Sequence, residues 1–468
     1  MAYHRSCTTT LELGAKAALL IVYTAALQEM VRLFSITPDV CGLTIREGLA
    51  EIVREGYEFI STNYVPGDEI FLIGFSRGAF TARSIAGLIG EVGVLTKSGL
   101  PYLSEIFRDV QHMHDPNYVP KHRDIPFPNK PSAKDPRYRR ELVRRGLTRR
   151  EIPIKAIGVW DTVGSLGTPR IGWLEKLGIQ SSATKEMSFY DTKLSNCIEN
   201  AFQALALDES RASFSPAVWE KAPGNTTTLR QVWFPGVHSN VGGGYPDQQI
   251  GNITLAWMMS QLAPFIDFDP EYILNQDEDN ERYYEKKGAP VRPWSFGKIY
   301  DSMSGLFALG GSLIRTPGTC YEIDPWTGRK TSKPLRDTHE YIHPSVRTRF
   351  CLKGPGVNDE GRYEAKALKD WKLMIEYDVG SKKPDVFWKA RSAKRNATTR
   401  ILPESPLWDM ERELLENDPE TYEYVMYPPQ QQVRKKVRER PVDDGGYYES
   451  RQPRVRERPT RNEGYYED

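Results

Sequence analysis

A serine held between two glycines is the part of this chain with the clearest chemical meaning. Residues 74–78 read Gly-Phe-Ser-Arg-Gly, and they follow an apolar run, Ile70–Ile73, and precede a helix-compatible stretch, Ala79–Leu88. A strand, a sharp turn and a helix in this order are the context of a nucleophile elbow. The glycines leave room for a turn that exposes the Ser76 hydroxyl, and the first helix amides, that of Arg77 included, point toward a developing oxyanion. The alternative is a Gly-Ser turn in an ordinary α/β protein.

A serine nucleophile needs a base and an acid that orients the base. The chain offers both in the order Ser, Asp, His, which is typical of hydrolases with this elbow. Asp161 directly follows a predicted buried strand, Ile154–Trp160, and His238 follows a second one, Leu229–Phe234, after a Pro-Gly-Val link. Functional groups of open α/β sheets lie beyond the carboxyl ends of strands, and all three residues fall there. The alternatives are a turn or helix-capping aspartate and a surface-loop histidine.

Two further residues are substitutes for these roles. Asp208, within Ala-Leu-Ala-Leu-Asp-Glu (204–209), is the fallback acid, although the default interpretation is that Asp208 or Glu209 forms a structural ion pair with Arg211. His343 is the fallback base, and no convincing strand precedes it.

Four sequence blocks in a fixed order carry a resemblance to a known family. They are Gly-Phe-Ser-Arg-Gly-Ala-Phe-Thr-Ala-Arg (74–83), Trp-Asp-Thr-Val-Gly-Ser (160–165), the block 204–209, and Val-Trp-Phe-Pro-Gly-Val-His-Ser-Asn-Val-Gly-Gly-Gly-Tyr (232–245). From about Gly42 to roughly residue 350, the chain resembles the DUF2235 family of α/β-hydrolase-like proteins. This family includes the catalytic domain of type VI secretion phospholipase effectors of the Tle1 class.

The resemblance implies both a fold and a set of roles. The implied fold is an α/β-hydrolase-like three-layer sandwich with a mainly parallel central sheet and helical insertions. By resemblance, Ser76 is the nucleophile, Asp161 the triad acid and His238 the base. Characterised bacterial members of the family hydrolyse phospholipid ester bonds, whereas many eukaryotic members have no assigned substrate.

The chain departs from the family pattern at its start. Members usually open with a hydrophobic strand and an Asp-Gly-Thr turn, but residues 1–41 contain no Asp-Gly pair, so the first family strand and one oxyanion-hole donor are expected to be missing. Leu11–Phe34 is mostly apolar and is predicted to be an amphipathic or buried helix. A signal peptide or membrane anchor is the alternative, but the uncharged run Ala17–Gln28 is shorter than the ~20 residues of a membrane span. A second departure is Asn240, where many relatives carry Asp.

Composition divides the rest of the chain into a domain, an insertion and a tail. Residues 42–428 are predicted to form the hydrolase-like domain, and residues 121–150 within it hold eleven Lys or Arg against three Asp or Glu. This basic insertion is either a solvated surface or a patch that binds anionic phospholipid. Near such a membrane, each basic side chain adds ~1 kcal/mol to the free energy of binding. Residues 295–320 are apolar and glycine-rich, and are interpreted as a lid, an acyl-chain wall or a core helix. Residues 429–468 contain a charged repeat with too few apolar side chains for a core, so a disordered tail is expected.

Charge and cysteine content narrow the class of protein. A net charge of +1 gives no global attraction to nucleic acid or membranes, and no nucleic-acid partner is expected. Five scattered cysteines without a Cys-x-x-Cys pair indicate a reducing, cytoplasmic location and argue against a disulfide framework or a zinc site, and no cofactor is expected. The prediction is a serine hydrolase of carboxylic esters, with lipid or phospholipid favoured, acting through an acyl-enzyme. The alternatives are a catalytically inactive interaction protein on the same scaffold and a small-substrate carboxylesterase or thioesterase.

Overall fold

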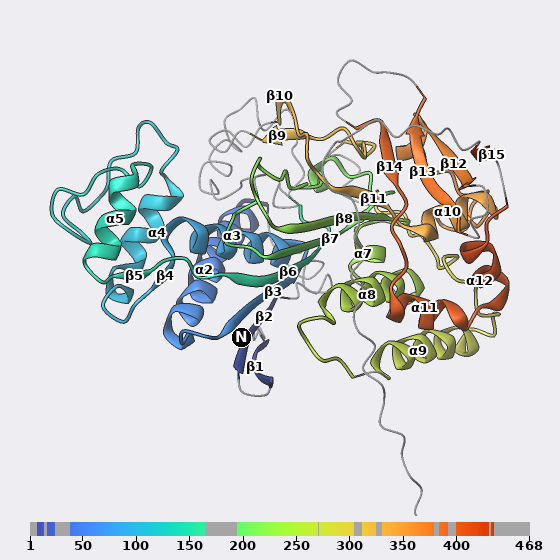
Figure 1. The fold of residues 1–468 in the computed structure, drawn as a ribbon, viewed down its shortest axis with the longest axis horizontal. Helices are drawn as coiled ribbons and strands as arrows, with labels where there is room; N and C mark the ends of the chain where they lie inside the picture. The colour runs from blue at the N-terminus through green and yellow to red at the C-terminus, as the bar shows by residue number, and fades with distance from the viewer. Residues whose placement is uncertain are drawn as a thin grey trace, which may run out of the picture.

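A mostly parallel β-sheet forms the centre of the protein (Figure 1). In this computed structural model the described residues are 7–13, 16–23, 38–163, 194–269, 271–303, 311–323, 330–378, 383–391, 399–429 and 432–434, and only the backbone of 7–49 and 432–434 is described. The sheet has the strand order β1 (Cys7–Leu13), β2 (Lys16–Tyr23), β3 (Glu69–Phe75), β6 (Ile154–Trp160), β7 (Asn200–Ala206), β8 (Thr228–Phe234) and β11 (Glu340–Ile342). Strand β1 is antiparallel to β2, and every other neighbouring pair in this sheet is parallel.

Helices cover both faces of the central sheet. Side chains of a strand point alternately to the two faces, and in β3 this places Ile70 and Leu72 in one core and Phe71 in the other. The first core is covered by α2 (Pro38–Asn63) and α3 (Arg77–Val92), and the second by α8 (Gln249–Leu262), α9 (Tyr272–Lys286), α11 (Asp409–Glu416) and α12 (Pro419–Met426). The predicted three-layer α/β architecture is therefore confirmed.

The first two strands correct the prediction for the start of the chain. Part of the segment 11–34, which was predicted to be helical, forms the end of β1 and all of β2, and residues 24–34 lie outside the described residues. Strand β2 pairs in parallel with β3, from Ala18 opposite Glu69 to Tyr23 opposite Gly74. A continuous apolar run with Ile and Val suits a parallel strand beside another strand, and this pairing decides its conformation. The sheet therefore has a parallel strand before β3, where one was expected to be missing.

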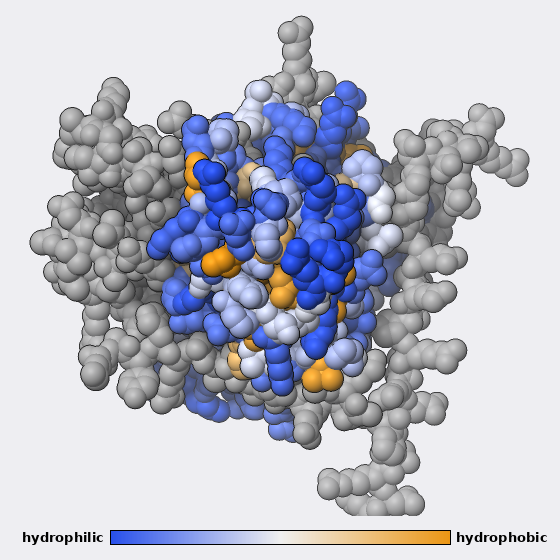
Figure 2. All heavy atoms as spheres, turned by 90° about the vertical axis from the view of Figure 1, so that its left-hand side faces the viewer, coloured by the Kyte–Doolittle hydropathy of each residue, from blue (hydrophilic) through white to orange (hydrophobic). Residues whose placement is uncertain are grey.

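The basic insertion belongs to a lobe at one side of the sheet, on the left in Figure 1. The lobe consists of β4 (Val94–Leu95), η1 (Leu100–Tyr102), α4 (Leu103–Gln111), α5 (Pro136–Arg144) and β5 (Thr148–Arg149), and β4 pairs with β5 where the lobe begins and ends. Its centre is the buried carboxylate of Asp109. This carboxylate accepts hydrogen bonds from Lys130, Tyr118 and Tyr138 at 2.6, 3.0 and 2.9 Å. The outer surface of the lobe is mostly hydrophilic (Figure 2).

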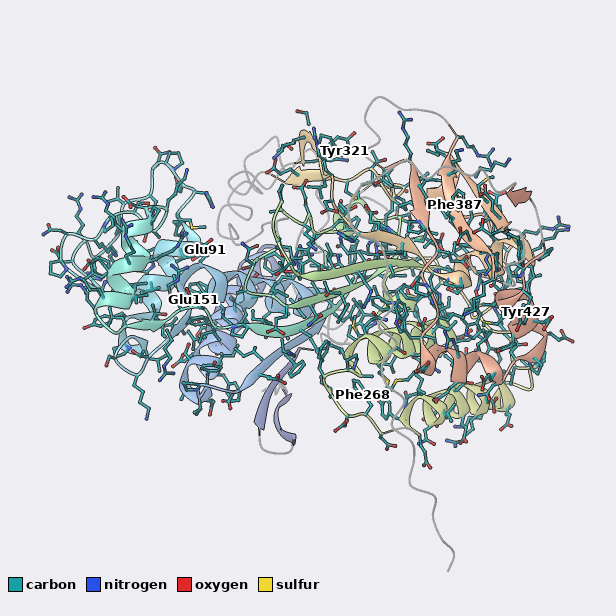
Figure 3. All side chains as sticks on the ribbon, in the orientation of Figure 1. Glu91, Glu151, Phe268, Tyr321, Phe387 and Tyr427 are labelled. Atoms are coloured by element: carbon teal, nitrogen blue, oxygen red, sulfur yellow. The ribbon has the colours of Figure 1, made fainter. Side chains whose placement is uncertain are left out.

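The remaining elements lie on the opposite side of the sheet or along its edge (Figure 1). They are η3 (Ala212–Phe214), α7 (His238–Val241), the hairpin β9 (Tyr321–Ile323) and β10 (Lys330–Pro334), α10 (Pro344–Cys351), η5 (Lys366–Leu368), and a sheet of β14 (Ile401–Pro403), β13 (Asp385–Ala390), β12 (Trp371–Asp378) and β15 (Gln432–Arg434). Figure 3 labels Tyr321 in β9 and Phe387 in β13.

Two predictions for the later part of the chain change with these elements. Strand β15 lies inside the segment 429–468 that was predicted to be a disordered tail, and it pairs in parallel with β12. Three backbone pairs with a neighbouring strand override a composition poor in apolar residues, and residues 435–468 lie outside the described residues. In the described parts of 295–320, which are 295–303 and 311–320, the chain forms loops and isolated bridges, and residues 304–310, on which the core-helix alternative depends, lie outside the described residues.

Candidate active site

Ser76 occupies the tight turn between β3 and α3. Its φ of 58° lies in the left-handed region with a ψ of −115°, a conformation that costs about 1–3 kcal/mol in a non-glycine residue. Gly74 permits the turn, because a Cβ there would lie 2.4 Å from the carbonyl carbon and oxygen of Gly78. The Ser76 N–H donates to the carbonyl of Trp160 at 3.1 Å, which joins the turn to the end of β6. The predicted order of strand, turn and helix is confirmed, and the serine is half-buried rather than enclosed.

His238 is the first residue of α7, directly beyond the end of β8. Its Nε2 lies 2.7 Å from Ser76 Oγ, and its Nδ1 lies 2.6 Å from Asp161 Oδ2. The rings of Phe75 and Phe214 flank the imidazole, with centroids 4.6 and 4.8 Å from its own. The structure therefore brings together the three residues predicted from the ends of β3, β6 and β8, and aromatic packing fixes the plane of the imidazole.

Asp161 follows β6 directly, and its side chain is fully buried. Oδ1 accepts a hydrogen bond from the N–H of Ala206 at 3.0 Å, and Arg315 contacts Oδ1 at 2.5 Å and Oδ2 at 2.9 Å. Burial by itself would raise the pKa of Asp161, but the charge of Arg315 and the hydrogen bonds with Arg315 and His238 outweigh it and hold that pKa well below its usual range. An ionised carboxylate only accepts hydrogen bonds. The proton therefore sits on Nδ1 of His238, which leaves Nε2 to accept the proton of Ser76.

Arg315 contacts Asp161 but was not among the residues predicted from the sequence. Besides Asp161, its guanidinium donates to the carbonyl oxygens of Ala206 at 2.6 Å and Phe214 at 2.8 Å. One signal was available, because Arg315 is the only charged residue between Asp301 and Glu322. A lone arginine in an apolar, glycine-rich stretch is seldom buried without a partner.

Glu209 holds the backbone at the start of α7. Its Oε2 accepts a hydrogen bond from the N–H of His238 at 3.2 Å, and Ser302 donates to its Oε1 at 3.0 Å. Arg211 binds both carboxylate oxygens at 2.9 Å, which is the ion pair expected between Arg211 and one of the two preceding acids. Burial would raise the pKa of Glu209, but the hydrogen bonds and charge of Arg211 lower it, so the carboxylate is ionised and a strong acceptor.

The fallback acid, Asp208, lies beside the site but has other partners. It accepts hydrogen bonds from the N–H of Gly236 at 2.7 Å and from the hydroxyl of Tyr363 at 2.9 Å. Burial raises the pKa of Asp208 to about 6. The carboxylate at the imidazole of His238 is that of Asp161, so Asp208 supports the link between β8 and α7.

The fallback base, His343, lies in the core. Strand β11 directly precedes it, contrary to the expectation that no strand does; with only three residues, this strand had too short a pattern to be recognised. Its Nδ1 lies 2.7 Å from Ser345 Oγ and its Nε2 2.7 Å from Glu411 Oε1. His343 and Ser345 are fully buried, so this cluster joins α10 to α11.

Arg77 and Asn240 lie close in sequence to Ser76 and His238, respectively. Arg77 is the first residue of α3, so its backbone N–H lies next to Ser76 at the positive end of the helix dipole. Asn240 accepts a hydrogen bond from the N–H of Val237 at 3.2 Å and donates to the carbonyl of Lys298 at 2.8 Å. The asparagine therefore fixes the loop that leads to His238.

Clustered metal ligands and membrane-spanning helices are both absent from the described residues. Within these ranges, no three or more His, Cys, Asp or Glu side chains are grouped so as to hold a metal ion. None of the helices in the same ranges has the length and apolar character needed to cross a bilayer.

The chain matches one protein family over a long segment. Residues 11–261 match the family described as the T6SS phospholipase effector Tle1-like catalytic domain. This segment is more than half of the chain and contains Ser76, Asp161 and His238, whereas Arg315 lies beyond it. A curated relative, the uncharacterized protein YEL023C of Saccharomyces cerevisiae, is 27% identical over 173 residues, which are 36% of this chain and 21% of the relative. The chain thus spans about a fifth of the length of the curated relative it matches. From the length of the family match, we conclude that this chain belongs to the family of Tle1-like phospholipase effector catalytic domains.

Proposed function

We propose that this protein is a serine hydrolase that cleaves carboxylic esters of lipids or phospholipids. One observation carries the proposal: a continuous chain of hydrogen bonds from the half-buried Ser76 hydroxyl through His238 to the ionised Asp161, with distances of 2.7 and 2.6 Å. A serine aligned with a base that an acid orients is the arrangement that activates a hydroxyl at neutral pH.

In the proposed reaction, Ser76 Oγ forms a bond to the carbonyl carbon of the ester while its proton passes to Nε2 of His238. The backbone N–H of Arg77 donates to the oxyanion of the tetrahedral intermediate. When the intermediate collapses, the ester C–O bond breaks and the alcohol leaves with the proton from His238. A water molecule that gives its proton to His238 then attacks the acyl-enzyme, which releases the acid and restores Ser76.

Two observations favour a lipid over a small ester. The family to which the chain belongs is described as a phospholipase effector. In addition, Leu313 and Ile314 are 48% and 43% exposed, and they directly precede Arg315, which contacts Asp161. Exposed apolar side chains gathered beside a polar site are suited to contact with acyl chains.

The test uses a fluorophosphonate probe, which reacts with an activated serine whatever the substrate. We expect peptide mass spectrometry to find the label on Ser76, and we expect Ser76→Ala and His238→Ala to remain unlabelled. Ser132→Ala is the matched control, because Ser132 is an exposed serine of the lobe. Untreated enzyme from the same preparation is assayed separately for release of fatty acid from phosphatidylcholine and phosphatidylglycerol vesicles, with p-nitrophenyl butyrate as the small ester.

The outcomes separate the three functional classes. Ser76 labelling together with fatty acid release supports the proposal. Labelling with turnover of the small ester alone would indicate a small-substrate carboxylesterase or thioesterase. Absence of label on a folded protein would overturn the proposal in favour of a non-catalytic interaction protein on this scaffold.

A further inference from the structure

The guanidinium of Arg315 holds the carboxylate of Asp161 on both oxygens. Its side chain is 1% exposed, and its two Nη atoms also donate to the carbonyls of Ala206 and Phe214. Arginine presents its N–H groups in a rigid planar fork that matches a carboxylate. Because both oxygens are engaged, Asp161 cannot rotate away from His238 without breaking contacts with Arg315.

We propose that Arg315 is a positioning residue of the active site, which fixes the orientation and the charge of Asp161 and thereby sets the pH dependence of Ser76 reactivity. The inference rests on the proposed function, because it describes the same Ser76, His238 and Asp161 at work. It goes beyond that function by assigning a role to a residue outside the segment that matches the family.

The backbone around Arg315 is tied to the loop that follows β7. The N–H of Ala212 donates to the carbonyl of Gly311 at 3.1 Å, and the N–H of Leu313 donates to the carbonyl of Ser210 at 2.8 Å. The loop after β7 also carries Glu209, which accepts a hydrogen bond from the N–H of His238. Arg315 therefore reaches Asp161 from a segment already fixed against the residues that place the imidazole.

The charge of Arg315 determines what Asp161 does to His238. An opposite charge within about 4–6 Å shifts a protonation equilibrium by about 1–3 pH units. With Arg315 in place, the negative charge of Asp161 is largely compensated, and its pull on a protonated imidazole is reduced. Without Arg315, the buried carboxylate would act on the imidazole with an uncompensated charge, which disfavours transfer of the Ser76 proton to Nε2.

Among the residues that the structure describes, few other charged side chains lie near Arg315 and Asp161. In the loop after β7, Glu209 and Arg211 compensate each other through their ion pair, and Asp208 lies against Gly236 and Tyr363. The turn from β3 to α3 brings Ser76 to the imidazole. Arg315 is thus the cation in direct contact with Asp161, and replacing it changes the charge felt by His238 more than replacing any of these groups.

The experiment measures the rate of Ser76 labelling by the fluorophosphonate probe between pH 4 and 9. In the wild type we expect the rate to fall at low pH, because a general base must be unprotonated to accept the proton of Ser76. In Arg315→Gln we expect this fall to occur about one pH unit or more higher, together with a loss of about 10- to 10²-fold in the plateau rate. In Arg315→Lys, which keeps the charge without the fork, we expect the wild-type pH midpoint and a plateau rate lowered by about tenfold.

The control is Arg347→Gln. Arg347 is equally buried and bidentate, with Glu404 as its partner at 2.7 and 2.9 Å, but it lies in α10. A change that only lowers the folded fraction reduces labelling at all pH values without moving the midpoint, and this is the result expected for Arg347→Gln.

Each outcome decides the role of Arg315. A wild-type midpoint in Arg315→Gln would overturn the proposal, whatever its plateau rate. If Arg315→Gln does not fold or labels too slowly to trace, the Lys variant decides, since a wild-type plateau rate there would show that the fork is not needed and would overturn it as well. A wild-type protein that does not label at all refutes the proposed function itself, which distinguishes that failure from failure of the role of Arg315.

Discussion

Replacing Asp161 by Asn tests the assignment of the acid, with Asp208→Asn as the matched control in the neighbouring loop. Asparagine has nearly the volume of aspartate but offers one acceptor oxygen and one donor NH2 group. If the NH2 group faces Nδ1 of His238, the ring must carry its proton on Nε2 and cannot accept the proton of Ser76. In either orientation the NH2 group also faces Arg315, so two donors oppose each other at a contact that is 2.5 or 2.9 Å in the wild type.

The structure allows both effects of Asp161→Asn to be sized. A triad whose acid becomes an amide loses about 10⁴-fold in turnover, because the histidine adopts the wrong tautomer. In addition, Arg315 is left as a buried cation without its anion, and breaking a buried pair in this way costs about 3–5 kcal/mol. We therefore expect both a loss of Ser76 labelling and a lower free energy of unfolding.

The control should leave labelling unchanged. In Asp208→Asn the amide oxygen still accepts the hydrogen bond that Gly236 donates at 2.7 Å, and the imidazole keeps Asp161 as its partner. The assay is the rate of fluorophosphonate labelling at pH 7, together with urea unfolding followed by tryptophan fluorescence. The reasoning would be refuted if Asp161→Asn labelled at the wild-type rate, or if Asp208→Asn lost as much activity as Asp161→Asn.

Three further outcomes are expected from the fold and its charges. Gly74→Ala should abolish Ser76 labelling, because its Cβ would meet the backbone of Gly78 at 2.4 Å. Gly87→Ala is the control, because nothing lies within 4 Å of the new Cβ. It should raise the free energy of unfolding in urea by about 0.5–1 kcal/mol. Folding raises the pKa of Asp208 from 3.8 to about 6, so its ionisation should lower the free energy of unfolding as the pH rises through this window. In urea unfolding at several pH values, Asp208→Asn should remove up to about 3 kcal/mol of this pH-dependent loss. Arg140→Glu changes an exposed site of the lobe. In a Ser76→Ala background it should weaken binding to phosphatidylglycerol vesicles, measured by sedimentation, by about 1–2 kcal/mol. In otherwise wild-type protein it should not change Ser76 labelling, because Ser76 lies at the start of α3, whose two ends are about 24 Å apart.

Local patterns were sufficient to predict the residues that meet at the site. The turn at Ser76 requires Gly74. Asp161 directly follows a buried strand, and His238 follows another after a three-residue link; the apolar runs of both strands are visible in the sequence. Each of these features is encoded within about ten neighbouring residues, and the parallel sheet then aligns the strand ends at one edge. The structure adds the distances that link the three side chains.

Features decided by long-range contacts could not be predicted in the same way. The apolar run in 16–23 fits a helix or a buried strand equally well by composition, and its pairing with β3 makes it a strand. Arg315 lies 154 positions from Asp161, so no local pattern joins them. Strands β11 and β15 have three residues each, which is too short for a recognisable alternation.

In the described part of the chain, two clusters combine a serine, a histidine and an acid, and their comparison shows what chemistry needs beyond residue type. His343 contacts Ser345 and Glu411 at 2.7 Å, much as His238 contacts Ser76 and Asp161. However, Ser345 belongs to the same helix as His343, and its N–H also donates to Nδ1 at 3.2 Å, so the imidazole serves as a helix cap. All three members of that cluster are at most 1% exposed, so a substrate cannot reach the hydroxyl.

The cluster of Ser76 differs in how its nucleophile is presented. The serine comes from another strand, is half-buried, and stands at the start of a 16-residue helix whose dipole favours negative charge. Its histidine is held by an acid that a buried arginine keeps ionised. For the proposed function, catalysis at Ser76 therefore depends on access, strand topology and a fixed charge, and the Arg315 variants test the last of these.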